Sequence, residues 1–238
     1  MKGFGTVVTG TASGGRVQLG DVLTAFPSGA SGRVRGIQVH GKDEPFALAG
    51  QRSAINLPDL KREHVPRGSV LASAGALLPS YLVDVEYRHL AGAPVPFKPK
   101  RVRFLCGTQE VVGNLVVFGE GSLAAGETRV AQLRLESPVA VRAGDRYVQR
   151  TYSPMTTVGG GRVLDSHPRK RKAADTGARA HLAAIAGDDP AVRAAALVAD
   201  GGPLGLTLEE LALRLPPGES EDAPSTVRTL ARSGALEI

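Results

Sequence analysis

Hydrophobic and polar residues alternate in short runs over the first 165 positions of the chain. In GRVRGIQVHG (32–41), Val34, Ile37 and Val39 alternate with arginine and glutamine, with one slip in the period. A period of two residues is typical of half-exposed β-strands. Turn residues separate such runs every 8–14 positions. The pattern predicts a mainly β fold with two consecutive antiparallel β-barrels, over 1–76 and 77–168.

The period changes after Pro168. The basic stretch PRKRK (168–172) reads as a linker, and apolar residues then recur at helical spacing in 174–187 and 189–202. Asp189 followed by Pro190 is a typical helix start. The pattern therefore predicts helices in the last third of the chain.

Two further helices are expected towards the end of the sequence. Thr207 and Glu210 form a capping box at the start of LTLEELALRL (206–215). The stretch 222–238 reads as another helix that stops at Gly234, with strand-like residues beyond it. This order predicts a linker and a small helical, winged-helix-like domain over 169–238.

Charge is distributed unevenly along the chain. The formal net charge is +6, but residues 79–172 carry fifteen basic and eight acidic residues, whereas residues 173–238 carry five and ten. A basic body favours a polyanionic partner, with ordinary surface arginine as the alternative. The acidic end disfavours a winged-helix DNA regulator.

Cysteine, histidine and hydropathy argue against several classes of protein. Cys106 is the single cysteine, which excludes a disulfide or a cysteine metal cluster within one chain. It lies among apolar residues in FLCG, and this context favours a buried packing role over a role as a nucleophile. An enzyme that uses Cys106 is therefore the less favoured interpretation. Neither a signal peptide nor an apolar run of about 18 residues occurs, so we expect a cytoplasmic protein without membrane contact. The five histidines show no ligand spacing and predict no metal site: His40, His64, His89, His167 and His181.

Glycines near the start of the chain raise the question of a phosphate loop. In KGFGTVVTGT (2–11), Gly5 and Gly10 have the spacing of the two phosphate-loop glycines. Thr11 and Ala12 stand where that loop requires lysine and serine or threonine, and no helical pattern follows. The glycines are better explained by strand curvature and close strand approach.

Several segments together resemble translation elongation factors. KGFGTVVTGTASGGRVQLGD, VRGIQVHGK, AGQRSAINL and VPRGSVL are similar to the second domain of these factors. The combination of IQVH and AGQR resembles the selenocysteine-specific elongation factor of the SelB type. RYVQRTYSPMTTVGGGRVLDSHPRKRK resembles the end of its third domain, and GLTLEELALRL its first winged-helix unit.

The resemblance implies a function in translation. Such a factor binds selenocysteinyl-tRNA and delivers it to the ribosome for selenocysteine incorporation at UGA codons. Family members begin with a GTPase domain that uses GTP and Mg and carries a phosphate loop, D-x-x-G and N-K-x-D, none of which occurs here. We therefore expect a chain that lacks GTPase activity and cofactors of its own and needs that domain, or its equivalent, as a partner. The winged helices that bind the selenocysteine-insertion hairpin of the mRNA would lie beyond residue 238.

The resemblance also implies an aminoacyl pocket in the first barrel. Arg52, in AGQR, lies where the family has a basic pocket residue, and His40, in QVHG, is a second candidate. A selenol is largely ionised at neutral pH and a serine hydroxyl is not, so fixed positive charge favours selenocysteine. The alternatives are an arginine that bonds a carbonyl or carboxylate and an exposed turn histidine. Other pocket residues of the family would lie upstream of Lys2.

Basic residues of the second barrel are candidates for binding the acceptor and T arms of tRNA through phosphate and 2′-hydroxyl groups. Ordinary surface arginine is the alternative for each one. Gly159–Gly161 would allow close approach of RNA or form a bulge, and Arg169–Lys172 would be a flexible linker or a phosphate contact. The candidates are Lys98, Lys100, Arg101, Arg103, Arg150 and Arg162.

A second class of function stays open from the sequence. The barrels would then be a protein-interaction scaffold that partners a separate translation GTPase and has no RNA role of its own.

Overall fold

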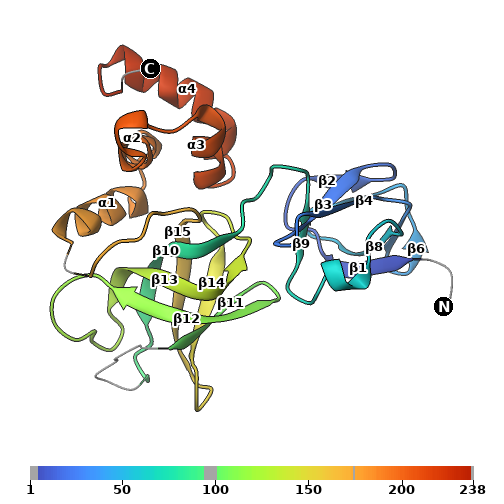
Figure 1. Cartoon of the computed structure of the whole chain (residues 1–238), viewed down its shortest axis with the longest axis horizontal. Coiled ribbons are helices and arrows are strands. Elements are labelled where there is room, and N and C mark those ends of the chain that lie inside the picture. The colour runs from blue at the N-terminus through green and yellow to red at the C-terminus, as the bar shows by residue number, and fades with distance from the viewer. Residues whose placement is uncertain (1–4, 94–100, 174, 237–238) are drawn as a thin grey trace. The chain divides into compact units, whose positions relative to one another are not determined.

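The computed structural model describes residues 5–93, 101–173 and 175–236. The chain divides into two compact units, Met1–Leu77 and Leu78–Ile238 (Figure 1). Each unit has its own hydrophobic core.

Short strands in three sheets make up the described part of the first unit. A four-stranded sheet has the order β1 (Thr6–Thr11), β8 (Arg52–Leu57), β5 (Gly36–Val39) and β6 (Lys42–Asp43). The other sheets are β2 (Arg16–Gln18) with β7 (Phe46–Leu48), and β4 (Ala30–Arg33), β3 (Val22–Phe26) and β9 (Val70–Ala72). A 3-10 turn, η1, covers Arg62–His64.

The alternation seen in the sequence is confirmed in this unit. Val34, Ile37 and Val39 are all buried and pack with Leu23 and Leu57 in one core. The described strands form three separate sheets, so closure of a first barrel over 1–76 stays a prediction.

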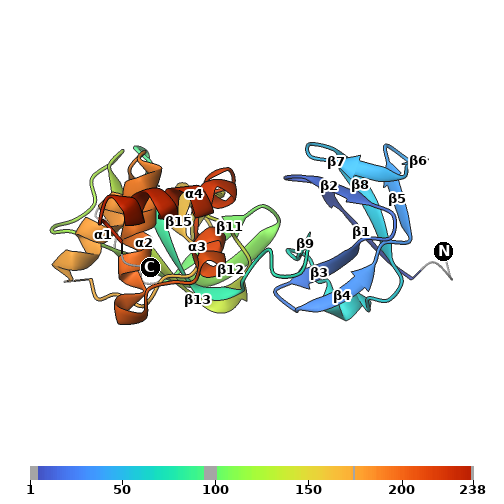
Figure 2. The same ribbon diagram turned by 90° about the horizontal axis from the view of Figure 1, so that it is seen from above.

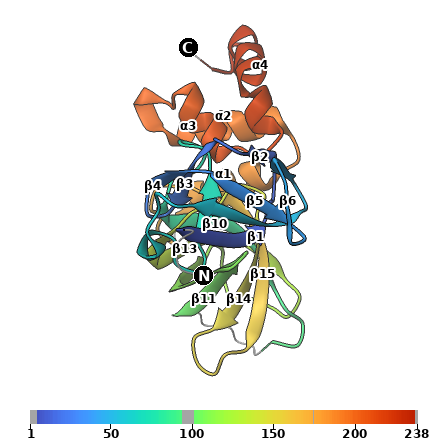
Figure 3. The same ribbon diagram turned by 90° about the vertical axis from the view of Figure 1, so that its right-hand side faces the viewer.

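The strands of the second unit form a closed barrel. Its described strands follow the order β10-β13-β12-β11-β14-β15, all antiparallel, and Figure 3 shows β11, β14 and β15 side by side. Alternate residues of β10, Val83, Val85 and Tyr87, point into the barrel core. The strands are β10 (Ser80–His89), β11 (Val102–Cys106), β12 (Gln109–Val117), β13 (Thr128–Val139), β14 (Arg146–Thr151) and β15 (Thr157–Asp165).

Three glycines in β15 permit close strand packing. A Cβ on Gly161 would lie 1.9 Å from the Glu86 carbonyl oxygen, and one on Gly160 would lie 2.4 Å from that of Tyr147. A Cβ on Gly159 would lie 2.4 Å from the Tyr87 ring. These contacts explain the glycines by barrel packing, without requiring RNA at this point.

Helices follow the barrel. They are α1 (Thr176–Ala186), α2 (Pro190–Asp200), α3 (Leu208–Arg214) and α4 (Glu219–Arg232), with a 3-10 turn η2 (Gly202–Leu204). The expected starts are confirmed for two of them. The Asp189 side chain caps α2 ahead of Pro190, and Thr207 and Glu210 form the capping box of α3.

The last helix begins earlier than the sequence pattern indicated. It starts at Glu219 rather than near residue 222, and three acidic residues in its first turn suit the positive end of the helix dipole. Gly234, with φ of 73°, follows its end as expected. The described residues after Asp165 contain no strand, so the winged-helix assignment stays a prediction.

The helices and the barrel share a hydrophobic core. Leu182, Leu197 and Leu211 of the helices pack with Phe118 and Leu164 of the barrel. Within this second unit the helices therefore pack with one another and with the barrel, and the view from above shows them overlying the barrel strands (Figure 2).

The basic stretch after the barrel is attached to the barrel at Arg169 and Arg171, while the side chains of Arg169, Lys170 and Lys172 are exposed. Arg171 is 4% exposed, and the Gln132 side chain donates to the Arg169 carbonyl oxygen over 2.9 Å. A phosphate contact by Arg171 is therefore wrong for this structure, because its guanidinium is buried and ion-paired.

Candidate functional site

Arg52 begins β8 of the four-stranded sheet, and His40 directly follows the end of β5, its neighbour in that sheet. Val39 of β5 pairs with Ser53 of β8, so the next positions in that register are His40 and Arg52. Both residues are exposed. Each residue selected for a pocket thus directly adjoins the last ladder pair of β5 and β8, Val39 with Ser53.

The backbone at His40 is set by a tight hairpin turn. Val39 pairs with Lys42, and the two residues between them, His40 and Gly41, have φ of 52° and 78°. Two positive φ angles are the mark of the turn that best fits the twist of a hairpin. His40 therefore has a structural role whether or not its ring contacts a ligand.

Arg52 has no counter-ion in the described part of the chain. No carboxylate of residues 5–93, 101–173 or 175–236 forms an ion pair with its guanidinium. An exposed arginine of this kind is available to an anionic ligand.

The arginines predicted to bind RNA lie on the outer surface of the second unit's barrel. Arg103 of β11 pairs with Arg150 of β14, and Arg146 of β14 pairs with Arg162 of β15. Val102, Phe104 and Tyr147, at intervening positions, point into the core. We call the outward set the basic face, and it comprises Arg101, Arg103, Arg146, Arg150 and Arg162.

Carboxylates neutralise three arginines of the basic face. Arg101 donates two hydrogen bonds to Glu136, at 2.9 and 2.8 Å, which lower the pKa of that carboxyl. Arg103 pairs with Glu110. Arg162 pairs with Glu86 over 3.4 Å and donates to the Ala186 carbonyl oxygen at the end of α1 over 2.7 Å.

Arg146 and Arg150 have no carboxylate partner among the described residues. Arg150 donates to the Thr157 hydroxyl over 3.2 Å. The two arginines line an open hollow of about 390 Å³ together with Leu105 and the exposed Val148. A hollow lined by cationic and apolar side chains can accept an anionic group attached to an apolar or aromatic body.

An aromatic ring lies between two members of the basic face. The guanidinium carbon of Arg101 is 4.2 Å, and that of Arg103 5.1 Å, from the Tyr152 ring centroid. Stacking of this kind holds planar guanidinium groups in place. The sequence analysis missed Arg146 and Tyr152, although the alternation of DRYVQRTY (145–152) puts both on the same side as Arg150.

Two residues of the predicted RNA-binding set, Lys98 and Lys100, lie outside the described residues. Of the other four, Arg101, Arg103 and Arg150 are brought together by the β11–β14 pairing. Arg162 lies on the same face, but its partners tie it to β10 and α1.

Cys106 lacks the properties of a nucleophile. Burial, with a smaller contribution from Asp145, raises its pKa to about 12. The thiol donates to the Arg146 carbonyl oxygen over 3.4 Å, and the side chain packs against the barrel core. A thiol with so high a pKa stays protonated at neutral pH and reacts poorly.

The described residues contain neither a metal-binding group nor a membrane-spanning helix. Within the described ranges, no group of three or more His, Cys, Asp or Glu side chains has the arrangement to hold a metal ion. In the same ranges, no helix is long and apolar enough to cross a membrane.

Comparison with known proteins shows what the chain is similar to. Residues 90–170 match the family model described as the β-barrel domain of selenocysteine-specific elongation factor. Over 214 residues, 89% of its length, the chain is 39% identical to the selenocysteine-specific elongation factor of Desulfomicrobium baculatum. This chain is a homologue of the selenocysteine-specific elongation factors.

Further comparisons agree with that relationship. The factor of Haemophilus influenzae is 31% identical over 172 residues, which are 72% of this chain. A crystal structure of a bacterial selenocysteine-specific elongation factor, EF-Sec, superposes with a TM-score of 0.72 and 27% identity over 92% of this chain and 35% of its own. The chain spans 33% and 27% of the two curated relatives, respectively.

Proposed function

We propose that this chain is the tRNA-delivering part of a selenocysteine-specific elongation factor, which brings selenocysteinyl-tRNA to the ribosome. The observation that carries the proposal is 39% identity to such a factor over 89% of the chain. The whole protein would use a GTP-binding domain as its switch. In this proposal the described residues bind tRNA and carry out no chemical step.

The first unit would recognise the aminoacyl group. Arg52, which has no carboxylate partner among the described residues, would offer a fixed positive charge to the ionised selenol, and His40 would add an imidazole donor beside it. Charge-assisted contacts are about twice as strong as neutral ones, so a selenolate would be preferred over a neutral hydroxyl. Discrimination would then rest on charge rather than on size.

The second unit would bind the tRNA stem through the basic face. Arg146 and Arg150 are the members whose charge no described carboxylate neutralises, and their hollow would accept a backbone phosphate. Contacts of this type read the shape of an RNA helix rather than its sequence. Steep salt dependence of binding is expected for the same reason.

A binding comparison tests the proposal. The chain, alone and joined to the GTP-binding domain of a relative, is titrated with selenocysteinyl-tRNA and seryl-tRNA, and Arg52→Ala is expected to abolish the preference for selenocysteine. Arg67→Ala, which removes an exposed arginine of the same unit, is the matched control. Equal binding of both tRNAs by the unchanged protein would contradict the pocket, and no tRNA binding with the GTP-binding domain restored would contradict the proposed function.

A further inference from the structure

Two aspartates on the outside of the barrel lie opposite each other beneath the helices. Asp84 of β10 and Asp165 of β15 are direct partners in the ladder, and both are 0% exposed. Like charges at directly opposite positions destabilise a sheet, and a buried carboxylate is costly unless it is paired. The barrel thus carries an acidic pair that requires cations from elsewhere.

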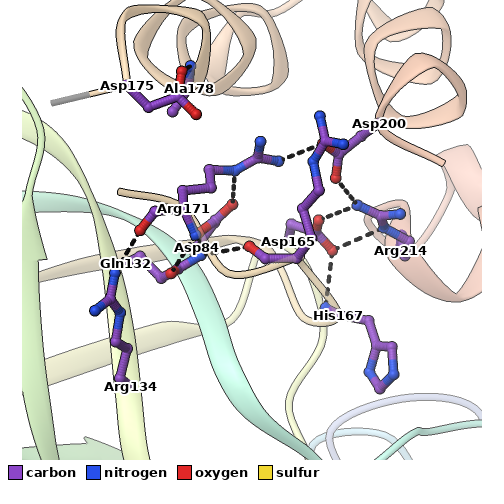
Figure 4. A network of polar contacts seen from close by, with 11 residues as sticks. Asp84, Gln132, Arg134, Asp165, His167, Arg171, Asp175, Ala178, Asp200 and Arg214 are labelled. Atoms are coloured by element: carbon purple, nitrogen blue, oxygen red, sulfur yellow. Dashed lines mark hydrogen bonds and ion pairs between the residues drawn. The ribbon is translucent and has the colours of Figure 1, made fainter. Parts of the chain in front are cut away.

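Two arginines from the segment after the barrel supply those cations (Figure 4). Arg214, at the end of α3, donates from Nε to Asp165 Oδ1 over 3.1 Å and pairs with the other oxygen as well. Arg171 donates from Nε to Asp84 Oδ2 over 3.3 Å. Each arginine is at most 7% exposed, so solvent screens these pairs little.

A third aspartate joins the two arginines. Asp200 accepts from Arg171 Nη2 over 2.7 Å and from Arg214 Nη2 over 3.0 Å. It is the last residue of α2, where a carboxylate is unfavourable to the helix dipole. Local helix formation therefore does not explain Asp200, whereas its two tertiary ion pairs do.

These contacts close an ionic ring of five residues: Asp84, Arg171, Asp200, Arg214 and Asp165, with the ladder pair completing the circuit. The ring joins β10 and β15 of the barrel, the basic stretch 168–172, and helices α2 and α3. It therefore connects the basic stretch and two of the helices directly with the barrel.

The backbone of the basic stretch is held at the same place. Arg171 N–H donates to Gln132 Oε1 over 3.2 Å, and Gln132 Nε2 donates both to the Arg169 carbonyl oxygen and to Asp84 Oδ1. Arg134 donates to the Arg171 carbonyl oxygen. The stretch is thus fixed by its main chain as well as by the Arg171 side chain.

The charges around the ring balance only when the segment is in place. Three carboxylates face two buried guanidiniums, and Arg169, with a side chain 62% exposed, adds a contact to Asp200 over 2.8 Å. His181 of α1 is the other titratable group nearby, and burial is the main cause that lowers its pKa. Without Arg171 and Arg214, Asp84 and Asp165 would be left as uncompensated neighbours.

We propose that the ionic ring is a docking device that fixes the helices and the basic stretch on the barrel in one arrangement, so that opening the ring releases both together. Asp84 and Asp165 provide the binding site on the barrel, and Arg171 and Arg214 are the two side chains that bind to it. Each guanidinium must contact its own carboxylate on the barrel, and both must contact Asp200. These requirements fix the position of the helices more narrowly than apolar packing alone would. This inference is independent of tRNA binding.

Trypsin provides the test, because the basic stretch contains four potential cleavage sites, Arg169–Lys172. With the ring intact, we expect the full chain to resist cleavage there. Asp200→Asn and Arg214→Gln should increase the cleavage rate within 168–172 by about ten-fold or more, because local opening exposes the stretch. These variants leave all four cleavage sites unchanged.

Arg193→Gln is the matched control. Arg193 is as buried as the ring arginines, at 5% exposure, but it bonds the Ile185 and Gly187 carbonyl oxygens and Glu219 within the helices. Its variant should be cut within 168–172 at the unchanged rate. If it is cut as fast as the ring variants, or if the ring variants are cut no faster than the unchanged chain, the proposal is wrong.

Two further measurements separate release from general unfolding. Amide hydrogen exchange of β10–β15 should stay slow in the ring variants while exchange in α2 and α3 accelerates. The double variant Asp165→Asn with Arg214→Gln should be cut no faster than Arg214→Gln alone, because the two residues act as one pair. Loss of protection across the barrel strands, or fully additive rates, would overturn the docking role.

Discussion

Arg103 and Arg150 lie opposite each other across the β11–β14 ladder, but only Arg103 has a carboxylate partner among the described residues. Glu110 neutralises Arg103, whereas Arg150 contacts the neutral hydroxyl of Thr157. The two arginines therefore differ in what they offer a polyanion, although their sequence contexts look alike. This difference gives the basic face an uneven charge.

Arg146→Gln and Arg150→Gln are expected to weaken tRNA binding more than Arg101→Gln. Each unpaired arginine that contacts a phosphate releases about one counterion, so each variant should reduce the slope of log affinity against log salt by about 1. Arg101→Gln removes a charge that Glu136 already pairs with, and it should change the slope little. Fluorescence anisotropy with labelled tRNA over a series of salt concentrations measures both quantities.

This prediction depends on the proposed RNA role and can fail separately from the ionic ring. The same slope for all three variants would mean that an arginine contributes equally to tRNA binding whether or not a carboxylate already pairs with it. A larger effect for Arg101→Gln would indicate that RNA displaces Glu136.

Gly161→Ala should destabilise the barrel strongly. The added Cβ would lie 1.9 Å from the Glu86 carbonyl oxygen, and backbone cannot move aside as a flexible side chain does. We expect the free energy of unfolding to fall by about 3 kcal/mol, as for severe overpacking. Chemical denaturation measures the loss, and Gly92→Ala, where no atom lies within 4 Å of the added Cβ, is the control.

The chain's local signals predicted the parts of the fold that depend on near neighbours. The Thr207–Glu210 capping box and the Asp189 cap each involve residues within three positions, and both were found where the sequence put them. The alternation of Val34, Ile37 and Val39 likewise gave buried positions, although Val34 lies between β4 and β5 and only the other two are in a strand. The early start of α4 was missed: the sequence pattern placed the helix from residue 222, whereas it begins at Glu219.

Pairings across the fold were beyond the reach of the sequence. Arg171 lies in a run of basic residues, so the sequence predicted an exposed side chain. It is buried because it pairs with Asp84, which is 87 positions away in the sequence. The Arg101–Glu136 pair spans 35 positions in the same way. Residue type and period gave the face on which an arginine lies, but not whether a carboxylate already neutralises it.

Asp84 should make the stability of the second unit depend on pH. Burial, and then the charge of Asp165, raise its pKa from 3.8 to about 7. Since the folded state binds this proton more tightly than the unfolded state does, the contribution of Asp84 to stability is full below about pH 4 and is lost as pH rises to about 7. The lowered pKa of His181 acts in the opposite sense, below its ordinary value of 6.5.

Asp84→Asn isolates this contribution, because His181 is the same in both proteins. The variant should be less stable at pH 5, because it lacks the proton that the folded state of the unchanged protein binds more tightly than the unfolded state does. The difference in free energy of unfolding between the two proteins should narrow as pH rises from 5 to 8. Denaturation in urea at several pH values measures it, and a difference that widens with pH would show that Asp84 is ionised throughout.

Cys106 should resist alkylation in the folded chain. Its pKa of about 12 leaves very little thiolate at pH 8, and the thiol lies against the barrel core. We expect iodoacetamide to modify it at least ~100-fold more slowly than in the chain unfolded in urea, because only the thiolate reacts. Mass spectrometry over time measures both rates in the same reagent. Rapid modification of the folded chain would revive an enzymatic role for this residue, whereas slow modification that becomes fast on unfolding fits a side chain whose function is packing.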